Sequence, residues 1–559
     1  MKKVFLVIFV FCARAVFSQT PEQIQRSQQQ LIDAGFRKQE LERAISKPST
    51  QQPQQHEETA PQTSSHCVQI NSIEFDGNTK LSNGKIKKLA KPFLNKCLAV
   101  DEINKLLNTI TNAYIDKGYI TSGAYLKTPQ TKTKEGILQI KIIEGSIEKF
   151  DGLTEAERIS AFPNLLGKIL NLRDIEQGLD QMNRLSSNHA TMEIKASETE
   201  NGTSQVVIKN TPDSRVSYNT YSDNLGSQST GQYRAGVNFG IDNMLGVNDQ
   251  LNIGYTNSLT EHYGDKNSHS ASIGFSVPFG YWTFTNNASY SYYKTNVKLP
   301  ISREKLYSFG DSWTDNFSVE RLLSRGQKYK VSALVGLTYK ENDNYTKVLD
   351  ILTKNEVSSR RLSNIEYALP TTIYFDRGVM FAKPSFVNGV KLFGSLEDDG
   401  TFAQKAQFEA YILYIYSGFN FGFVNLATTF DGQYSRDELF SSDGFYIGSE
   451  ASVRGFSNDG ITGDSGFYIR NDLKFSLSDI FKSQNVFLRD FSPSIFFDYG
   501  FVKANNNDEK SELSSMGAKI NYRYKILNFS TTYAHPLKKE NGMNGTPETY
   551  FTISINGRF

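Results

Sequence analysis

The chain has 559 residues, a formal net charge of +2 at pH 7, a sequence pI of about 8.1 and a mean hydropathy of −0.44. This near-neutral balance does not suggest a nucleic-acid partner. Beyond the N-terminus, no apolar run is long enough for a membrane-spanning helix. Helical membrane spans and nucleic-acid binding are therefore set aside at the outset.

The first 18 residues have the features of a secretory signal peptide. Lys2 and Lys3 precede an apolar run, and small residues occupy the two positions that determine cleavage after Ser18. A single-span anchor is the alternative, but the apolar run is too short to cross a bilayer and is interrupted by Arg14. The sequence predicts export and removal of residues 1–18.

Residues 19–45 are predicted to form a polar helix. Thr20 is a typical N-cap, Pro21 suits the first helical position, and Gln23 completes a capping box. The apolar residues form only a thin stripe, so this helix needs a wet or polar environment; a solvated, partly frayed helix is the alternative. Residues 46–66 are rich in Gln, Pro, Ser and Thr and are predicted to be a flexible linker.

Two α+β units with the same order of elements follow, at residues 67–145 and 146–212. The first is predicted as a strand, two helices and two strands, at Val68 to Phe75, Gly84 to Lys91, Val100 to Lys117, Tyr119 to Leu126 and Ile137 to Ile143. The second repeats this order between Ile147 and Ile208. A β-α-α-β-β arrangement used twice indicates a repeat.

Cys67 and Cys97 are the two cysteines that remain after removal of the signal peptide. In an oxidising compartment, two cysteines with nothing else to bind favour one disulfide. Two unpaired buried thiols are the alternative. Neither reading implies catalysis, because the chain has no C-x-x-C motif.

Residues 213–559 alternate between apolar and polar residues with a period of two. An apolar face rich in Tyr and Phe and a polar face of Ser, Thr, Asn and Gly are typical of a membrane β-barrel with a water-filled lumen. A soluble sandwich also alternates, but would be unusual over this length. At about 20 to 22 residues per strand and connection, the segment predicts about 16 antiparallel strands. Phe559, ending the last strand, resembles an outer-membrane assembly signal.

Two motifs in the barrel segment predict a contact inside the pore, Val453-Arg454-Gly455-Phe456 and Phe496-Phe497-Asp498-Tyr499-Gly500. A guanidinium group suits bidentate binding of a carboxylate, which favours a salt bridge between Arg454 and Asp498. Gly455 permits a tight bend, and Gly500 leaves room for a close approach. Because the lumen is expected to be wet, the pair should be weaker than a dry one. A surface arginine in an ordinary loop is the alternative.

The sequence shows no catalytic or metal-binding pattern. Ser465, in Gly463-Asp464-Ser465-Gly466, resembles a protease nucleophile, but no histidine and carboxylate pattern accompanies it. The histidines lack metal-ligand spacing and the chain has no phosphate loop. We therefore expect no enzyme activity, no cofactor, no metal and no direct use of ATP.

With these motifs, the chain closely resembles the TpsB transporters of two-partner secretion, the hemolysin secretion and activation type (ShlB/FhaC/HecB, CdiB-like) of the POTRA-plus-barrel superfamily. Further matching stretches are Tyr114 to Tyr119, Leu172 to Leu185 and Asp223 to Gly226. The resemblance implies two periplasmic POTRA domains, a pore-plugging helix at 19–45, and a loop carrying Arg454 that folds inward to reach Asp498. It also implies a Gram-negative outer-membrane location and ATP-independent transport of an unfolded exoprotein, which would be a hemolysin, a contact-dependent inhibition toxin or an adhesin.

The expected partners are this secreted TpsA-type exoprotein, outer-membrane lipid, and the barrel assembly machinery during biogenesis. Exposed POTRA strand edges would bind the exoprotein by β-augmentation. A closed barrel can function as a monomer. Two other functions stay open: an insertase of the same superfamily, although insertases usually carry more POTRA units and no plug helix, and a diffusion porin, which would leave residues 68–208 without a role.

Overall fold

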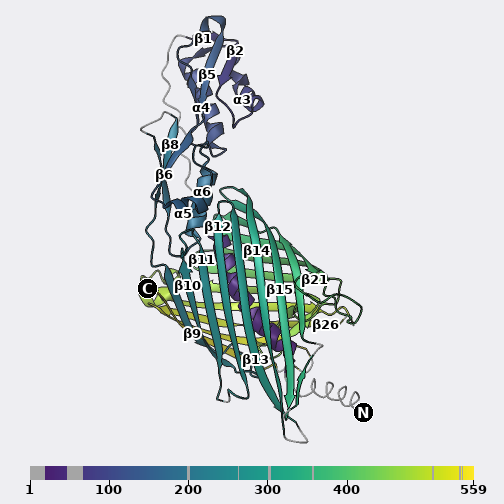
Figure 1. Cartoon of the computed structure of the whole chain (residues 1–559). Helices are drawn as coiled ribbons and strands as arrows, with labels where there is room; N and C mark the ends of the chain where they lie inside the picture. Colours follow the sequence, from purple (N-terminus) through teal and green to yellow (C-terminus); the bar gives the residue numbers. More distant parts are fainter. Residues whose placement is uncertain are drawn as a thin grey trace.

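The computed structural model describes residues 19–46, 67–197, 202–261, 263–299, 304–349, 351–355, 358–506, 509–540, 543 and 545–559. The predicted signal peptide and residues 47–66 of the predicted linker lie outside the described residues. The described part comprises one long helix, two small α+β units and a large barrel (Figure 1). Among the described helices, none combines the length and apolarity needed to cross a membrane.

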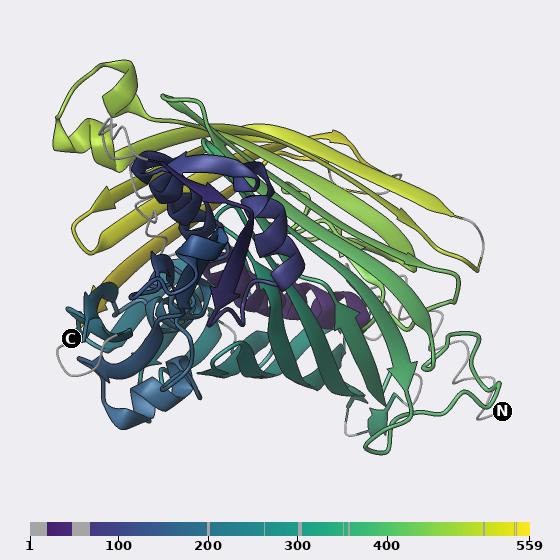
Figure 2. The same cartoon turned by 90° about the horizontal axis from the view of Figure 1, so that it is seen from above.

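The helix α2 (Pro21–Ile45) runs through the interior of the barrel (Figures 1 and 2). Its predicted capping box is confirmed: the Gln23 backbone N–H donates to the Thr20 hydroxyl over 3.2 Å, and the Thr20 N–H donates to the Gln23 side chain over 2.8 Å. These bonds satisfy groups that a helix end otherwise leaves unpaired. The alternative of a solvated helix is not what the structure shows.

The first α+β unit has a central sheet in the order β2-β5-β4 and a separate pair of strands, β1 and β3. Its elements are β1 (Cys67–Ile70), β2 (Ser72–Asp76), α3 (Asn83–Ala90), η1 (Lys91–Phe93), β3 (Lys96–Ala99), α4 (Val100–Ile115), β4 (Gly123–Leu126), η2 (Thr133–Glu135) and β5 (Ile137–Ile143).

Two strand predictions in this unit are wrong. The predicted strand from Val68 to Phe75 is broken at Asn71, because β1 pairs with β3 while the backbone N–H groups of Asn71 and Ser72 both donate to Gly136. The strand predicted from Tyr119 begins only at Gly123. The pairing partner of each segment, which local sequence does not specify, sets these boundaries.

The second unit contains β6 (Ser146–Asp151), α5 (Glu155–Ala161), α6 (Leu172–Asn183), β7 (Thr191–Ala196) and β8 (Thr203–Lys209), with the sheet order β6-β8-β7. In each three-stranded sheet, the strand that comes first in the chain lies parallel to the one that comes last, β2 beside β5 and β6 beside β8. An antiparallel strand completes each sheet. This shared topology confirms the predicted repeat.

The barrel strands are β9 (Val216–Asp223), β10 (Tyr233–Asp242), β11 (Gln250–Leu259), β12 (Asn267–Phe279), β13 (Trp282–Lys298), β14 (Lys305–Arg325), β15 (Tyr329–Val348), β16 (Ile351–Lys354), β17 (Arg360–Ala368), β18 (Thr371–Phe375), β19 (Gly378–Val390), β20 (Glu409–Asn420), β21 (Val424–Ser435), β24 (Ser465–Phe475), β25 (Phe491–Lys503), β26 (Lys510–Tyr524), β27 (Leu527–Lys538) and β28 (Glu548–Arg558). β16, β17 and β18 all pair with β15 and fill one position, so the described residues form sixteen antiparallel strands. The prediction of about 16 strands is confirmed.

The barrel closes where β28 pairs with β9, so no strand edge of the ring is left open to lipid. Along β13, Ser289 and Ser291 are buried toward the interior, whereas Trp282 at its start is exposed on the outer wall. Two of the connections between barrel strands are long insertions, one between β21 and β24 and one between β24 and β25. One carries the short hairpin β22 (Phe445–Ile447) and β23 (Ile461–Gly463), and the other carries the helices α7 (Leu477–Ile480) and α8 (Val486–Asp490).

Candidate functional site

The Val453-Arg454-Gly455-Phe456 segment lies between β22 and β23, in a loop that packs inside the barrel. Val453 and Phe456 are fully buried in an apolar cluster with Ile447, which precedes them, and Leu513 on β26. Gly455 has a φ of +94°, a conformation that favours glycine. The backbone therefore turns sharply just after Arg454 and leaves the arginine side chain directed at the barrel wall.

Arg454 makes a bidentate contact with Asp498 on β25. Its Nε atom lies 2.7 Å from Asp498 Oδ2, and its Nη2 atom lies 2.7 Å from Oδ1. The Arg454 backbone N–H also donates to Oδ2, over 3.2 Å. The side chains of Arg454 and Asp498 are only 1% and 0% exposed. The two predicted partners are thus in contact, and the expectation that their pair would be wet is wrong because the infolded loop covers both groups.

Asp472 on β24 is a second carboxylate at this site, and sequence reasoning missed it. It lies 2.8 Å from Arg454 Nη1 and is cross-strand neighbour to Phe496. Its side chain is 31% exposed, so this contact is more open than that with Asp498. The available signal was the alternation of β24, which places Asp472 on the same inward face as Tyr468.

The aromatic ring of Phe496 completes the arginine pocket. The guanidinium carbon of Arg454 lies 3.6 Å from the centre of this ring, a cation–π contact. Two carboxylates therefore hold the edges of the guanidinium plane while an aromatic ring covers one of its faces. Such an arrangement suits arginine better than lysine, whose ammonium group is a point charge.

Gly500 and the last barrel strand fix the rest of the loop. A Cβ atom on Gly500 would lie 2.7 Å from Val453 Cγ2, so only glycine leaves room for the loop here. The Gly455 N–H donates to the Tyr550 hydroxyl over 2.7 Å, and Ser457 donates to Glu548. The loop is thus held by β24 and β25 on one side and by β28, at the closing seam of the barrel, on the other.

The same loop also holds α2. Arg26 donates to the Gly444 carbonyl over 2.7 Å, Gln30 donates to the Tyr446 carbonyl over 3.0 Å, and Ser449 donates to Gln30 over 2.6 Å. Gly444 lies just before β22, Tyr446 within it and Ser449 just after it, on the segment that leads to Arg454. The helix and the infolded loop therefore share an interface.

Charged residues on the C-terminal half of α2 bind the barrel wall itself. Arg37 forms an ion pair with Asp431 on β21 and lies over the ring of Tyr414. Glu40 lies 3.3 Å from Lys383 on β19. These polar contacts explain why the helix has so few apolar residues, because its surroundings are the polar lumen wall.

Helix α6 of the second unit docks on the rim of the barrel. Asp180 lies 3.0 Å from Arg325 and 2.8 Å from Lys330, on either side of the turn between β14 and β15. Gln181 donates to the Gly280 carbonyl, in the turn before β13, over 3.0 Å. The stretch Leu172 to Leu185, singled out in the sequence, thus places the second unit over one mouth of the barrel (Figure 1).

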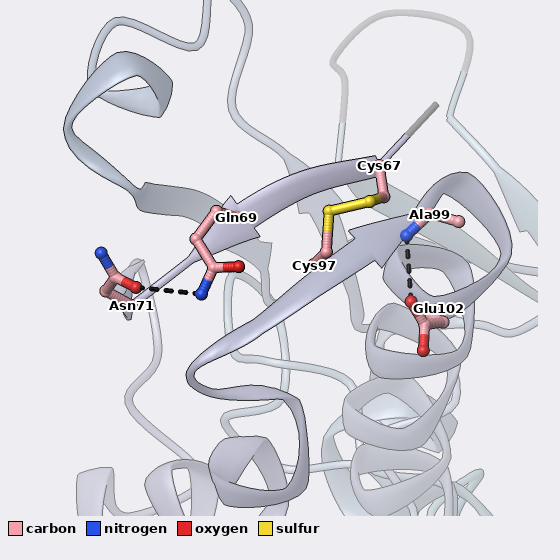
Figure 3. The surroundings of a disulfide bond; sticks show 6 residues. All are labelled: Cys67, Gln69, Asn71, Cys97, Ala99 and Glu102. Carbon is pink, nitrogen blue, oxygen red and sulfur yellow. Dashed lines mark hydrogen bonds between the residues drawn. A yellow bond between two sulfur atoms is a disulfide. The ribbon is translucent and has the colours of Figure 1, made fainter. Parts of the chain in front are cut away.

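The remaining sequence candidates lie away from the loop. Cys67 and Cys97 form a disulfide between β1 and β3, with Cα atoms 5.3 Å apart, and the Glu102 side chain accepts the Ala99 N–H just beyond it (Figure 3). Phe559 is 73% exposed, and its ring stacks on Tyr218 of β9. These residues serve local structure in the first unit and at the barrel seam.

Ser465 and Asp464 have structural contacts. Ser465 donates its hydroxyl to the Ser435 carbonyl over 3.0 Å, and Asp464 accepts the N–H groups of Leu439 and Asn505, each over 2.6 Å. These bonds organise the loops around β24. Within the described residues, no group of three His, Cys, Asp or Glu side chains is arranged to hold a metal ion.

A closed sixteen-stranded barrel that contains a helix and an infolded loop, with two α+β units at one mouth, defines an outer-membrane transporter of the POTRA-plus-barrel class. Comparisons with known proteins agree. Residues 202–541 match the family described as haemolysin secretion/activation protein ShlB/FhaC/HecB, residues 68–145 match the ShlB-type POTRA domain, and residues 139–196 match a POTRA domain.

Individual relatives cover most of the chain. It is 31% identical to the outer membrane transporter CdiB of Dickeya dadantii, over 73% of this chain and 72% of that protein. It is 28% identical to the hemolysin transporter protein ShlB of Serratia marcescens, over 89% of this chain and 86% of that protein. The solved structure of CdiB from Escherichia coli matches with a TM-score of 0.83 at 26% identity, over 96% of this chain and 99% of that one.

The chain therefore belongs to the haemolysin secretion/activation ShlB/FhaC/HecB family, the TpsB transporters of two-partner secretion. It is an outer-membrane protein whose two POTRA domains lie in the periplasm. The barrel mouth below α6 is accordingly the periplasmic one.

Proposed function

We propose that this transporter carries a TpsA-type exoprotein, unfolded, from the periplasm through its barrel to the cell surface without ATP. The observation that supports this most strongly is the shared interface of α2 and the infolded loop. Together they fill the polar lumen, which is the path that an exported chain would take. A simple porin has no use for a helix held in its pore by hydrogen bonds and ion pairs. We further infer that the protein has no enzymatic role and works as a monomer, since its ring of strands closes within one chain.

Arg454 has a positioning role in this proposal. Its contacts with Asp498 and Asp472 hold the loop against the wall, and the loop holds α2 through Arg26 and Gln30. Release of the helix is then coupled to movement of the loop. The pair sets the position from which the pore opens, and the substrate need not touch it.

The POTRA domains supply the capture step. The sheet orders β2-β5-β4 and β6-β8-β7 leave an outer strand on each side of each sheet. Such edges can pair with an extended chain by β-augmentation, which would satisfy the backbone groups of an unfolded substrate. Docking of α6 on the barrel rim places the second domain beside the periplasmic mouth, where a captured segment would enter.

The test is export of the large exoprotein encoded beside this transporter, co-expressed with it in a Gram-negative outer membrane. We expect the exoprotein in the medium only when the transporter is present, and a strong loss of export with Arg454→Ala. Arg361→Ala is the matched control, because Arg361 forms a 2.7 Å ion pair with Glu341 but is 56% exposed. A correctly inserted barrel that exports nothing would contradict the proposal and favour an insertase or a porin.

A further inference from the structure

The connection between β24 and β25 is unusual for its end of the barrel. The neighbouring connections at this periplasmic end are short, at residues 421–423 and 525–526, whereas this one spans residues 476–490 and contains α7 and α8. Ser476 donates its backbone N–H to the Phe423 carbonyl over 2.9 Å, which ties the insertion to the adjacent turn. Periplasmic turns of such barrels are ordinarily short, so the added length needs an explanation.

The insertion lies on the outside of the barrel. Figure 2 shows this yellow-green segment projecting beyond the strands at the end that carries the two POTRA domains. The ring of Phe487 on α8 lies 5.5 Å from that of Phe491 and 5.4 Å from that of Tyr522. Phe491 has the parity of Ile495 and Phe497, both exposed on the outer wall, so α8 rests on the surface that faces lipid.

The other side of the insertion is apolar and uncovered. Ile480, Phe481, Val486 and Phe487 are between 41% and 64% exposed. Clusters of exposed apolar residues of this kind mark surfaces with a partner. The cluster is continuous with the outer wall through the stacked ring of Phe487, and the lipid that covers the wall is the nearest apolar phase.

We propose that α7 and α8 form an interfacial anchor that inserts into the inner leaflet of the outer membrane. Phe481 and Val486 would lie among the upper acyl chains, and Lys482, exposed between the two helices, would lie at the phosphate level. The partner is thus a phospholipid surface. This inference does not depend on which substrate the barrel transports.

Site-specific labels test the anchor in the full chain. Phe481→Cys and Val486→Cys are labelled with an environment-sensitive fluorophore; Cys67 and Cys97 are joined to each other and do not react. The protein is reconstituted into vesicles of phosphatidylethanolamine and phosphatidylglycerol. Met516→Cys, on the outer wall, is the lipid-exposed control, and Tyr125→Cys, on the first POTRA domain, is the water-exposed control.

We expect lipid carrying a nitroxide high on its acyl chains to quench the labels at 481 and 486 roughly twofold, as at 516, while iodide in the water quenches only the label at 125. Iodide quenching at both 481 and 486 would overturn the proposal, since it places the insertion in water. Labels shielded from both quenchers would also overturn it and point to a protein partner. Heat-dependent mobility in gels shows that each variant remains a folded barrel.

Discussion

Replacing Arg454 with alanine should release the infolded loop from the barrel wall. The substitution leaves the Asp498 carboxylate, which is 0% exposed, without its guanidinium partner. Removing one member of a buried ion pair costs about 3 to 5 kcal/mol because the remaining charge stays buried and unpaired. This corresponds to a shift of about 150-fold to 5,000-fold toward the released loop.

The geometry also predicts an order among related variants. Asp472 is 31% exposed, so water screens its contact with Arg454, and Asp472→Asn should cost only about 1 kcal/mol. Asp498→Asn should come close to the alanine variant of Arg454. The cost of Arg454→Lys should fall between that of Asp472→Asn and that of Arg454→Ala, because a lysine keeps the charge but cannot form the bidentate contact.

Backbone hydrogen exchange measures loop release directly. Peptides that cover residues 451–459 should exchange faster in Arg454→Ala, since the N–H groups of Arg454 and Gly455 lose their ordered acceptors. Peptides from β25 serve as an internal control for intact strands. Unchanged loop exchange in Arg454→Ala, or a larger effect for Asp472→Asn than for Asp498→Asn, would refute the reasoning from burial.

Three further predictions concern other parts of the chain. Replacing Cys67 and Cys97 with serine removes a crosslink across 30 residues and should cost the first POTRA domain about 3 to 4 kcal/mol, seen in calorimetry as an earlier unfolding step. Burial raises the pKa of Glu144, but hydrogen bonds, foremost from the Lys80 N–H, outweigh it and hold the pKa below its ordinary 4.5. The Glu144 carboxylate therefore stabilises the domain fully above its ordinary pKa of 4.5, and this stabilisation is lost as the pH falls through its lower pKa in the folded state. Circular dichroism against pH should show a weaker loss of this kind in Glu144→Gln. Deleting Phe559 should lower the yield of heat-modifiable, folded barrel in the outer membrane, and an unchanged yield would exclude an assembly role.

Features that depend on neighbouring residues could be predicted from the amino-acid order. Alternation with a period of two requires strands with one apolar face, and its length predicted the number of strands that the structure contains. The capping residues Thr20, Pro21 and Gln23 predicted where α2 begins. An arginine followed by Gly455 and an aspartate two residues before Gly500 predicted the contact that the structure contains between Arg454 and Asp498.

The way these parts surround one another depends on contacts between distant segments, which local sequence does not specify. The register of β24 against β25 brings Asp472 beside Phe496, and thus beside Arg454, which no local pattern specifies. Burial of the Arg454–Asp498 pair depends on the whole loop folding inward. The pair is therefore buried, whereas the sequence predicted a contact exposed to water. The break at Asn71 and the position of α8 on the outer wall likewise depend on pairing and packing with distant segments. Local periodicity fixes which face a residue occupies, but closure of the ring fixes what that face meets.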